Sequence, residues 1–443
     1  MRLKPHFIQN QQMYGMIHCI ISNHVQLRKK QKMICKKTIL PKKLCEKGFL
    51  FIIVLFLCCS CSVKEREDTD TFNYQYEYSN SVWNIAEKDG YYYTNCNGLV
   101  QVSSRENLNF APLCANPDCK HDSDSCSARP DGGDSPLFAY GGKLYMLQSE
   151  YDERKDIYLK NLKEISSDNF TYTTVATIDE STEGENQAFS AFLHRGSLYY
   201  ISESAESDYT TKVKVCKLDL QGDKKPEVLL EVSDRYSGGS MFACENKVFF
   251  RINSYDLNVL EGIEELNEET LEEVYGLGES SLYFYQTDNE TLEQLMLPQD
   301  VFVSSFCADG EFLYYIERKT LKIHKLDLQT GTDSVLCSLE SSELNADLWC
   351  NENYLFVWHY MELFGKSDAP YTVEVYDRTG LLADKVELPV QKEYNYAGMP
   401  MGADEKYMML YSRAENVIWV YDMAQIGSEE GQWEAVPLAV PGN

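Results

Sequence analysis

The stretch DGEFLYYIERKTLKIHKLDLQTG spans Asp309 to Gly331 and contains two apolar runs separated by a short polar break. The first run, Phe312 to Ile316, is rich in aromatic residues, and the second, Leu321 to Leu328, alternates apolar and polar side chains. Such alternation is typical of half-buried strands, and a glycine after polar residues favours a tight turn. The stretch therefore predicts most of a small antiparallel sheet.

Six further copies of the aromatic start occur along the chain. They read DGYYYTN from Asp89, GGKLYML from Gly141, RGSLYYI from Arg195, ENKVFFR from Glu245, NENYLFVW from Asn351 and DEKYMML from Asp404. Most copies are followed by a strand that ends in a polar turn, as in VCKLDLQGD from Val215 to Asp223. Each unit then contains four antiparallel strands, and a repeat of about 50 residues with this content is typical of a β-propeller blade.

The number of copies predicts the architecture of the domain. A lone four-stranded sheet exposes both faces, whereas stacking such sheets in a ring buries the faces against each other. Seven copies predict an all-β propeller of about seven four-stranded blades over residues 72–443, with six or eight blades as alternatives. We expect the first and last blades to be the least regular, with one completing the other across the ring closure.

One long gap between copies holds an acidic insertion from Asp256 to Gly278. Its apolar residues approximate a helical stripe: Leu260, Ile263, Leu266, Leu271 and Val274. The pattern predicts one short, solvated helix on the surface. The alternative is a helix that docks a partner on the rim of the propeller.

The charge of the chain is unevenly divided. The formal net charge is −28, but residues 1–60 hold 11 of the 41 Lys and Arg residues and only one of the 69 acidic residues. The rest of the chain therefore carries 30 basic and 68 acidic side chains, a net charge of −38. So acidic a surface argues against a nucleic-acid partner and against docking on anionic lipid by charge alone.

A secretory signal peptide is predicted over residues 33–60. Lysines between Lys36 and Lys47 precede the apolar run Gly48 to Leu57, and this order of charge and hydrophobicity is typical of export signals. The run is short for a transmembrane helix, which needs about 20 apolar residues. Because Met33 begins a signal of ordinary length, residues 1–32 are interpreted as an over-extended gene start.

The residues after the apolar run, Cys58-Cys59-Ser60-Cys61, resemble the lipobox of bacterial lipoprotein precursors, in which a small residue precedes the lipidated cysteine. Cys58 stands where that family usually has leucine. The resemblance implies that Cys61 is diacylated and binds the lipid bilayer at the extracytoplasmic face of the cell membrane, since buried acyl chains contribute about 0.8 kcal/mol per CH₂. A secreted protein and an uncleaved anchor are the alternatives. The polar composition of residues 61–71 predicts a flexible tether.

A second cysteine cluster lies in the segment PLCANPDCKHDSDSCSA, from Pro112 to Ala128. It contains Cys114, Cys119, His121 and Cys126. Three thiolates and an imidazole are a ligand set for tetrahedral Zn²⁺, with bonds of about 2.0 to 2.3 Å. The set resembles a zinc knuckle in composition, although its spacing is C-x4-C-x-H-x4-C and that of the knuckle is C-x2-C-x4-H-x4-C. A structural zinc is therefore one interpretation, and four protein ligands argue against a catalytic metal.

The competing interpretation of this segment is a disulfide. An exported protein can form disulfides, so Cys114 can pair with Cys119 or Cys126 to staple the loop. Free thiols are the third alternative. The isolated cysteines of the repeats are expected to be small core residues: Cys216, Cys244, Cys307, Cys337 and Cys350.

A lipobox, aromatic propeller repeats and an early Cys-Cys-His-Cys loop together resemble a group of bacterial surface lipoproteins. The propeller of that group is related to the TolB-like and YWTD-like repeats. The resemblance covers about residues 50–440 and implies a fold and a location, but no reaction.

The sequence shows no G-x-S-x-G, H-E-x-x-H, P-loop or Rossmann motif. His194 and His324 lie beside repeat strands, where a structural histidine is expected, and His359 could point into the central channel. We therefore expect a binding or interaction module for a glycan, peptide or protein at the cell surface. A carbohydrate-active hydrolase or lyase and a structural component of an envelope assembly are the alternatives.

Overall fold

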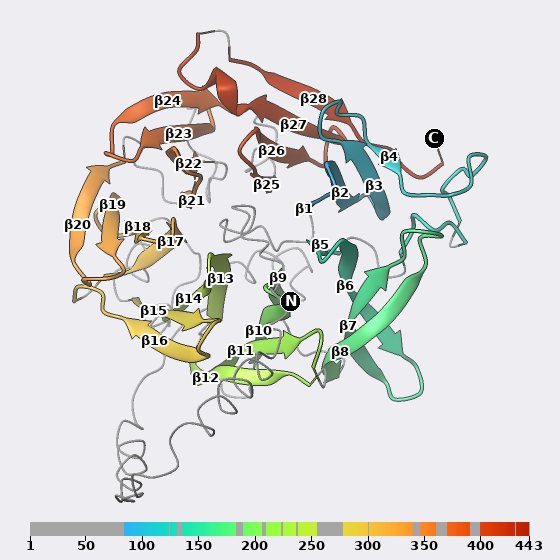
Figure 1. Cartoon of the computed structure of the whole chain (residues 1–443), viewed down its shortest axis with the longest axis horizontal. Coiled ribbons are helices and arrows are strands. Elements are labelled where there is room, and N and C mark those ends of the chain that lie inside the picture. Colours follow the sequence, from blue (N-terminus) through green and yellow to red (C-terminus); the bar gives the residue numbers. More distant parts are fainter. Residues whose placement is uncertain are drawn as a thin grey trace, which may run out of the picture. The chain divides into compact units, whose positions relative to one another are not determined.

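The computed structural model describes residues 84–442 with gaps at 124, 131–134, 183–188, 206–209, 223–224, 236–237, 255–277, 300, 340–345, 360–369, 390–398 and 430. The described residues form seven sheets of four antiparallel strands each (Figure 1). The prediction of an all-β propeller with about seven blades is thereby confirmed. The predicted signal peptide, Cys61, the tether and, apart from Gly278, the helical insertion lie outside the described residues.

The strands of each blade are consecutive in the chain, and the first strand of each is innermost in the ring (Figure 1). The first blade contains β1 (Ile85–Lys88), β2 (Tyr91–Cys96), β3 (Leu99–Ser104) and β4 (Ala111–Pro112). The second contains β5 (Leu137–Tyr140), β6 (Lys143–Asp152), β7 (Ile157–Ile165) and β8 (Tyr172–Thr182). The third contains β9 (Phe189–His194), β10 (Ser197–Ala205), β11 (Thr210–Asp219) and β12 (Glu227–Arg235).

The remaining four blades follow the same plan. The fourth contains β13 (Gly238–Cys244), β14 (Lys247–Ser254), β15 (Glu279–Gln286) and β16 (Thr291–Leu295). The fifth contains β17 (Val303–Ala308), β18 (Phe312–Glu317), β19 (Lys322–Asp327) and β20 (Asp333–Ser338). The sixth contains β21 (Asp347–Cys350), β22 (Tyr354–His359), β23 (Thr372–Asp377) and β24 (Leu382–Glu387). The seventh contains β25 (Met399–Ala403), β26 (Tyr407–Ser412), β27 (Val417–Asp422) and β28 (Trp433–Pro437).

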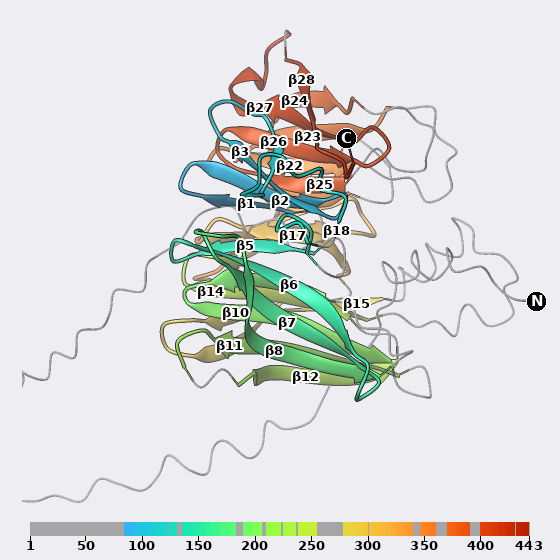
Figure 2. The ribbon, with the colours of Figure 1, turned by 90° about the vertical axis from the view of Figure 1, so that its right-hand side faces the viewer.

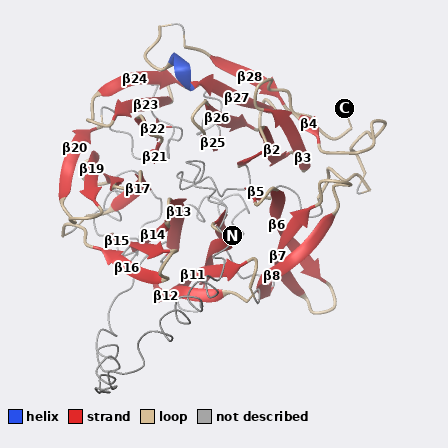
Figure 3. Ribbon diagram, viewed as in Figure 1, coloured by secondary structure: helices blue, strands red, loops and turns tan. Residues whose placement is uncertain are grey.

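Helical structure is limited, among the described residues, to one 3-10 turn, η4 (Met423–Gln425), between the last two strands (Figure 3). In this part of the chain no helix is long and apolar enough to cross a membrane.

The aromatic starts of the first four blades begin with turns of two residues. The first turn residue has a positive φ in each case: 54° at Asp89, 57° at Gly141, 45° at Arg195 and 52° at Glu245. Two-residue turns with positive φ twist in the same sense as the strands they join. The repeated motif therefore fixes the register of the inner hairpin in these blades.

The inner hairpins of the last three blades use a different turn, of three residues. Each opens with Asp309, Asn351 or Asp404, whose side-chain oxygen accepts a hydrogen bond from the amide three residues later, at 2.8, 2.9 and 2.7 Å respectively. Gly310 follows with a φ of 91°, a conformation that favours glycine. The polar turns that close the third strands are similar, since Asp327 and Asp377 accept amide hydrogen bonds from the residues that follow them.

Apolar side chains fill the space between neighbouring blades, which lie face to face in the side view of Figure 2. Between the fourth and fifth blades, the ring centroids of Phe242 and Phe306 are 4.8 Å apart. Between the sixth and seventh, Trp358 packs in one cluster with Leu410 and Tyr421. Similar clusters join the other neighbouring pairs, including the seventh blade and the first. The core is therefore divided into layers between the sheets.

Side chains of the preceding blade satisfy backbone groups on several innermost strands. Asn84 exchanges two hydrogen bonds with the backbone of Leu137, at 2.6 and 2.9 Å. The amide of Gly239 donates to Glu203 at 2.8 Å. Similar bonds run from the amide of Val303 to Ser280 and from that of Leu348 to Ser305, at 2.8 and 2.9 Å. Because an unpaired strand edge is costly when buried, these contacts stabilise the central part of the ring.

Among the described residues, the ring closes without a shared strand. The first blade is built from β1–β4 and the seventh from β25–β28, so the expectation that one terminal blade completes the other is wrong. Side chains join the two blades instead. The Tyr92 hydroxyl donates to Asp404, and the Arg105 guanidinium lies 3.0 Å from the same carboxylate. We call this contact between the first and seventh blades the seam.

We expect Asp404→Ala to lower the free energy of unfolding by about 3 to 5 kcal/mol, because the change leaves Tyr92 and Arg105 without their shared buried partner and also removes the acceptor of the turn between β25 and β26. Urea unfolding followed by tryptophan fluorescence measures the difference. Glu405→Ala is the matched control, since Glu405 also pairs with Arg105 but its side chain is 74% exposed. Its loss should be about 1 kcal/mol or less, and equal losses in the two variants would contradict this account of the seam.

Candidate metal centre

The loop after β4, residues 113–128, is tied to the first blade at both ends by one residue of β3. The amide of Leu113 donates to the carbonyl of Val100, and the amide of Val100 donates to the carbonyl of Ala128, both at 2.8 Å. From the second blade, the Tyr172 hydroxyl donates to the carbonyl of Ser127 at 2.8 Å. We call residues 113–128 the cysteine loop. It leaves and rejoins the sheet at one point, so its side chains are held close together.

Two tight turns place the candidate ligands within the cysteine loop. The amide of Cys119 donates to the Asn116 carbonyl at 3.2 Å, and the amide of Cys126 donates to the Ser123 carbonyl at 3.0 Å. His121 has a φ of 53°, in the left-handed region. This conformation turns the chain between Cys119 and Cys126.

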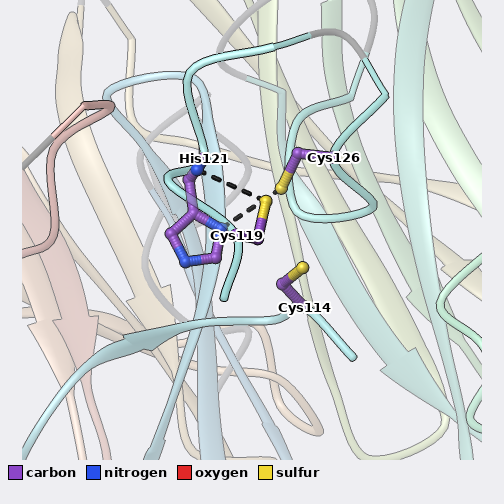
Figure 4. A group of neighbouring side chains, drawn as sticks. All are labelled: Cys114, Cys119, His121 and Cys126. Atoms are coloured by element: carbon purple, nitrogen blue, oxygen red, sulfur yellow. Dashed lines mark hydrogen bonds between the residues drawn. The ribbon is translucent and has the colours of Figure 1, made fainter. Parts of the chain in front are cut away.

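The structure brings the four predicted ligands together (Figure 4). One donor atom from each of Cys114, Cys119, His121 and Cys126 lies within 4.8 Å of all the others. The Nδ1 atom of His121 is 3.2 Å from the sulfur of Cys126, and the His121 amide donates to the sulfur of Cys119 at 3.4 Å. Ligands of a tetrahedral zinc ion are about 3.3 to 3.8 Å apart, given the usual bond lengths. The donor atoms therefore have the chemistry of a zinc site, and their separations, within 4.8 Å, are close to those of a bound shell without matching them all.

Two thiols of the cluster, those of Cys114 and Cys126, differ in acidity. Burial raises the pKa of Cys126, and its thiol neighbours reinforce the effect, to about 11. Burial also acts on Cys114, but hydrogen bonds with the backbone of Asn116 and with Ser127 outweigh it and lower the pKa of Cys114. Cys114 therefore ionises more readily than Cys126. Further thiolates in so small a space repel each other, and a bound divalent cation removes that repulsion.

All nine cysteines among the described residues are free thiols. Cys126 is buried beside Leu99 and Ala128, whereas Cys114 and Cys119 are partly exposed. A cation can therefore reach the cluster from solvent past Cys114 and Cys119, while packing holds the buried Cys126 in place.

The histidines of the repeats are buried within the blades. His194 is buried and packs beside Tyr199. His324 lies 2.8 Å from Asp333 and 3.4 Å from Glu317, as expected of a structural histidine. His359 is also buried, only 1% exposed, so it is not open to a central channel.

His359 lies instead against a buried carboxylate that sequence analysis did not identify. Its Nε2 atom is 3.6 Å from Glu374, which also accepts hydrogen bonds from Tyr376 and Lys385 at 2.7 and 3.0 Å. Burial alone would raise the pKa of Glu374, but His359, Tyr376 and Lys385 outweigh it and lower the pKa to about 2. The signal in the sequence was an acid in the middle of the apolar strand TVEVYD.

A second feature missed in the sequence is a hollow on the long hairpin formed by β6 and β7. It is lined by Tyr151 and Tyr158 and by the charged residues between them, including Asp152, Glu153 and Arg154. The two tyrosines are cross-strand partners, and their ring centroids are 5.0 Å apart. Their exposed fractions, 46% and 42%, are high for aromatic side chains. The hairpin therefore presents an aromatic surface with charges of both signs around it.

No protein-family model matches the chain, and no curated protein is found to be related to it. Among solved structures, the chain is similar to the computationally designed Ika8 protein, with 11% identity over 84% of this chain and 91% of that chain and a TM-score of 0.41. It is also similar to TolB from Acinetobacter baumannii, with 14% identity over 80% of this chain and 81% of that chain and a TM-score of 0.37. Both similarities are distant and concern the fold alone.

Proposed function

We propose that the protein is a lipid-anchored binding protein on the extracytoplasmic face of the cell membrane, whose propeller binds a glycan, a peptide or another protein. The observation that carries the binding part is the exposed pair Tyr151 and Tyr158 on the hairpin of the second blade. Exposed aromatic pairs with polar surroundings are typical of recognition surfaces, because tyrosine offers a large contact area at a small entropic cost.

The scaffold supports this role. Strands β6 and β7 are ten and nine residues long and pair along their whole length, so the tyrosines are held by continuous backbone hydrogen bonds. Nearer the base of the same hairpin, the paired residues Leu147 and Leu162 belong to the core shared with the third blade. A binding surface on such a rigid element loses little entropy when a ligand binds.

The anchor is proposed from the sequence alone. Cys61 follows a basic and apolar leader, and the polar residues 62–71 separate it from the propeller. Acyl chains on Cys61 would hold the domain at the bilayer, and two chains are needed for stable attachment. The tether then allows the propeller to reach ligands at a short distance from the membrane.

The cysteine loop is proposed to bind one structural Zn²⁺ ion through Cys114, Cys119, His121 and Cys126. Four protein ligands complete a tetrahedral shell, which leaves no position for a substrate or a reactive water. The role of the ion is therefore to order the loop rather than to catalyse a reaction.

We expect residues 62–443, purified without chelator, to carry one zinc ion per chain in native mass spectrometry and to lose it in EDTA. Cys119→Ser should abolish zinc binding because it removes one ligand. Cys337→Ser, which changes a partly exposed thiol of the fifth blade, is the control and should retain the ion. A metal-free chain whose mass is lower by two protons for each bridge would support the disulfide interpretation instead.

Cys61→Ser should move the full-length protein from the membrane fraction into the soluble or secreted fraction, because the lipidated thiol is lost. Fractionation and immunoblotting measure the change, and Cys59→Ser is the control that should remain at the membrane. Retention of the Cys61→Ser variant at the membrane would contradict lipidation and favour an uncleaved anchor.

Glycan and peptide arrays, with affinity capture from native envelopes, test the binding role. We expect the double variant Tyr151→Ala, Tyr158→Ala to weaken binding of the captured ligand by at least about tenfold, as is usual for central aromatic contacts. Tyr91→Ala, at an equally exposed tyrosine of the first blade, should bind normally. Undiminished binding by the double variant would exclude this hairpin, and no ligand in either assay would contradict the proposed function.

A further inference from the structure

We propose that metal binding by the cysteine loop closes the propeller ring, because the loaded loop holds the last residues of the chain, 438–442, against the first blade. This inference rests on the proposed zinc site and goes beyond it. Under this proposal the ion stabilises the contact between residues 438–442 and the first blade, in addition to ordering the cysteine loop.

In the part of the chain that the structure describes, no strand is shared across the seam, so its contacts are made by side chains and single backbone groups. Gln101 of β3 makes two hydrogen bonds with the backbone of Ala439, at 3.1 and 2.8 Å. Tyr411 donates to the side chain of Asn97 at 3.0 Å. Each of these hydrogen bonds joins one pair of residues, whereas a shared strand would add a continuous series of backbone hydrogen bonds. The segment that follows β28 therefore adds to the seam, which also contains the Asp404 contact and the apolar cluster between the two blades.

That segment lies directly against the cysteine loop. The amide of Gly442 donates to the carbonyl of Lys120 at 3.1 Å. Lys120 stands between two of the proposed ligands, Cys119 and His121. The position of this carbonyl is therefore set by the same turn that orients both ligands.

Apolar packing makes a second contact between the loop and the end of the chain. Leu99, Cys126 and Ala128 form a small buried cluster, and Ala439, Cys114 and Cys119 each pack against it. The ligand Cys126 is thus part of the surface on which residue 439 packs, and the ligands Cys114 and Cys119 border the same cluster. A change in the arrangement of the ligands would change that surface.

A bound ion would stabilise both the cysteine loop and its contact with residues 438–442. Without the ion, the ligands are held together by a few hydrogen bonds and by turns that contain little apolar surface. A divalent cation binds the closed arrangement selectively and stabilises it by mass action. The stabilisation extends to residues 438–442, because they pack on the cysteine loop.

Amide hydrogen exchange, measured by mass spectrometry and by NMR, tests the proposal on residues 62–443, which include every described residue. We expect zinc to slow exchange in 438–442 by about tenfold or more relative to EDTA-treated protein, with the Gly442 amide as the most direct probe. Exchange in β14, in the fourth blade away from the seam, should be unchanged and serves as the internal control.

Two variants distinguish the effect of the ion from the effect of the hydrogen bonds between Gln101 and Ala439. His121→Ala should lose the ion and exchange like the EDTA-treated protein at 438–442, even in zinc. Gln101→Ala should retain the ion but exchange faster at Ala439, since its two hydrogen bonds to that residue are lost. Cys337→Ser is the matched control and should resemble the unaltered protein in both measurements.

The outcomes are distinguishable. One bound zinc with unchanged exchange at 438–442 would overturn the closure role and leave the zinc site standing. No bound zinc in native mass spectrometry would overturn the zinc site and the closure role together. Both measurements use the unaltered protein, so they remain decisive even if a variant fails to fold.

Discussion

The structure depends on the burial of both faces of every four-stranded sheet. Each sheet has apolar residues on two sides, and the clusters that fill the spaces always contain residues of neighbouring blades, as Phe242 and Phe306 show. A closed ring buries both faces of all seven sheets, whereas an open stack would leave one face of each terminal sheet exposed. The contact between the first and seventh blades is therefore a condition for the stability of all the others.

Most of the fold could be predicted from the sequence because its determinants are local. A turn such as Asp89-Gly90 fixes the register of one hairpin, and the aromatic residues that follow show which strand is buried. The seam could not be predicted, since Tyr92 and Asp404 are 312 residues apart and neither belongs to a motif that indicates the other. The contact between Glu374 and His359 could not be predicted for a different reason, since the two residues become neighbours only through the register of β22 and β23.

In the candidate site, likewise, the contacts within one short segment could be predicted from the sequence, and the contacts with a distant segment could not. Cys114, Cys119, His121 and Cys126 lie in one short segment, so their convergence could be predicted from spacing and ligand chemistry. The contact of this segment with Ala439 and Gly442 could not, because those residues are small and carry no ligand atoms. The proposed role of the loop at the seam thus rests on contacts that its motif does not contain.

The remaining cysteines show why the environment, and not the residue type, decides the chemistry. Cys216, Cys244, Cys307 and Cys350 are buried in strands, and burial raises the pKa of Cys244 and Cys307 well above the usual thiol value. All four pack as small apolar groups, as predicted, and the raised pKa keeps Cys244 and Cys307 neutral; Cys337, on an outer strand, is only partly buried. A strand places successive side chains on opposite faces, so it cannot gather three thiols at one point. Turns can, and the cysteine loop is where the chain leaves the regular sheet.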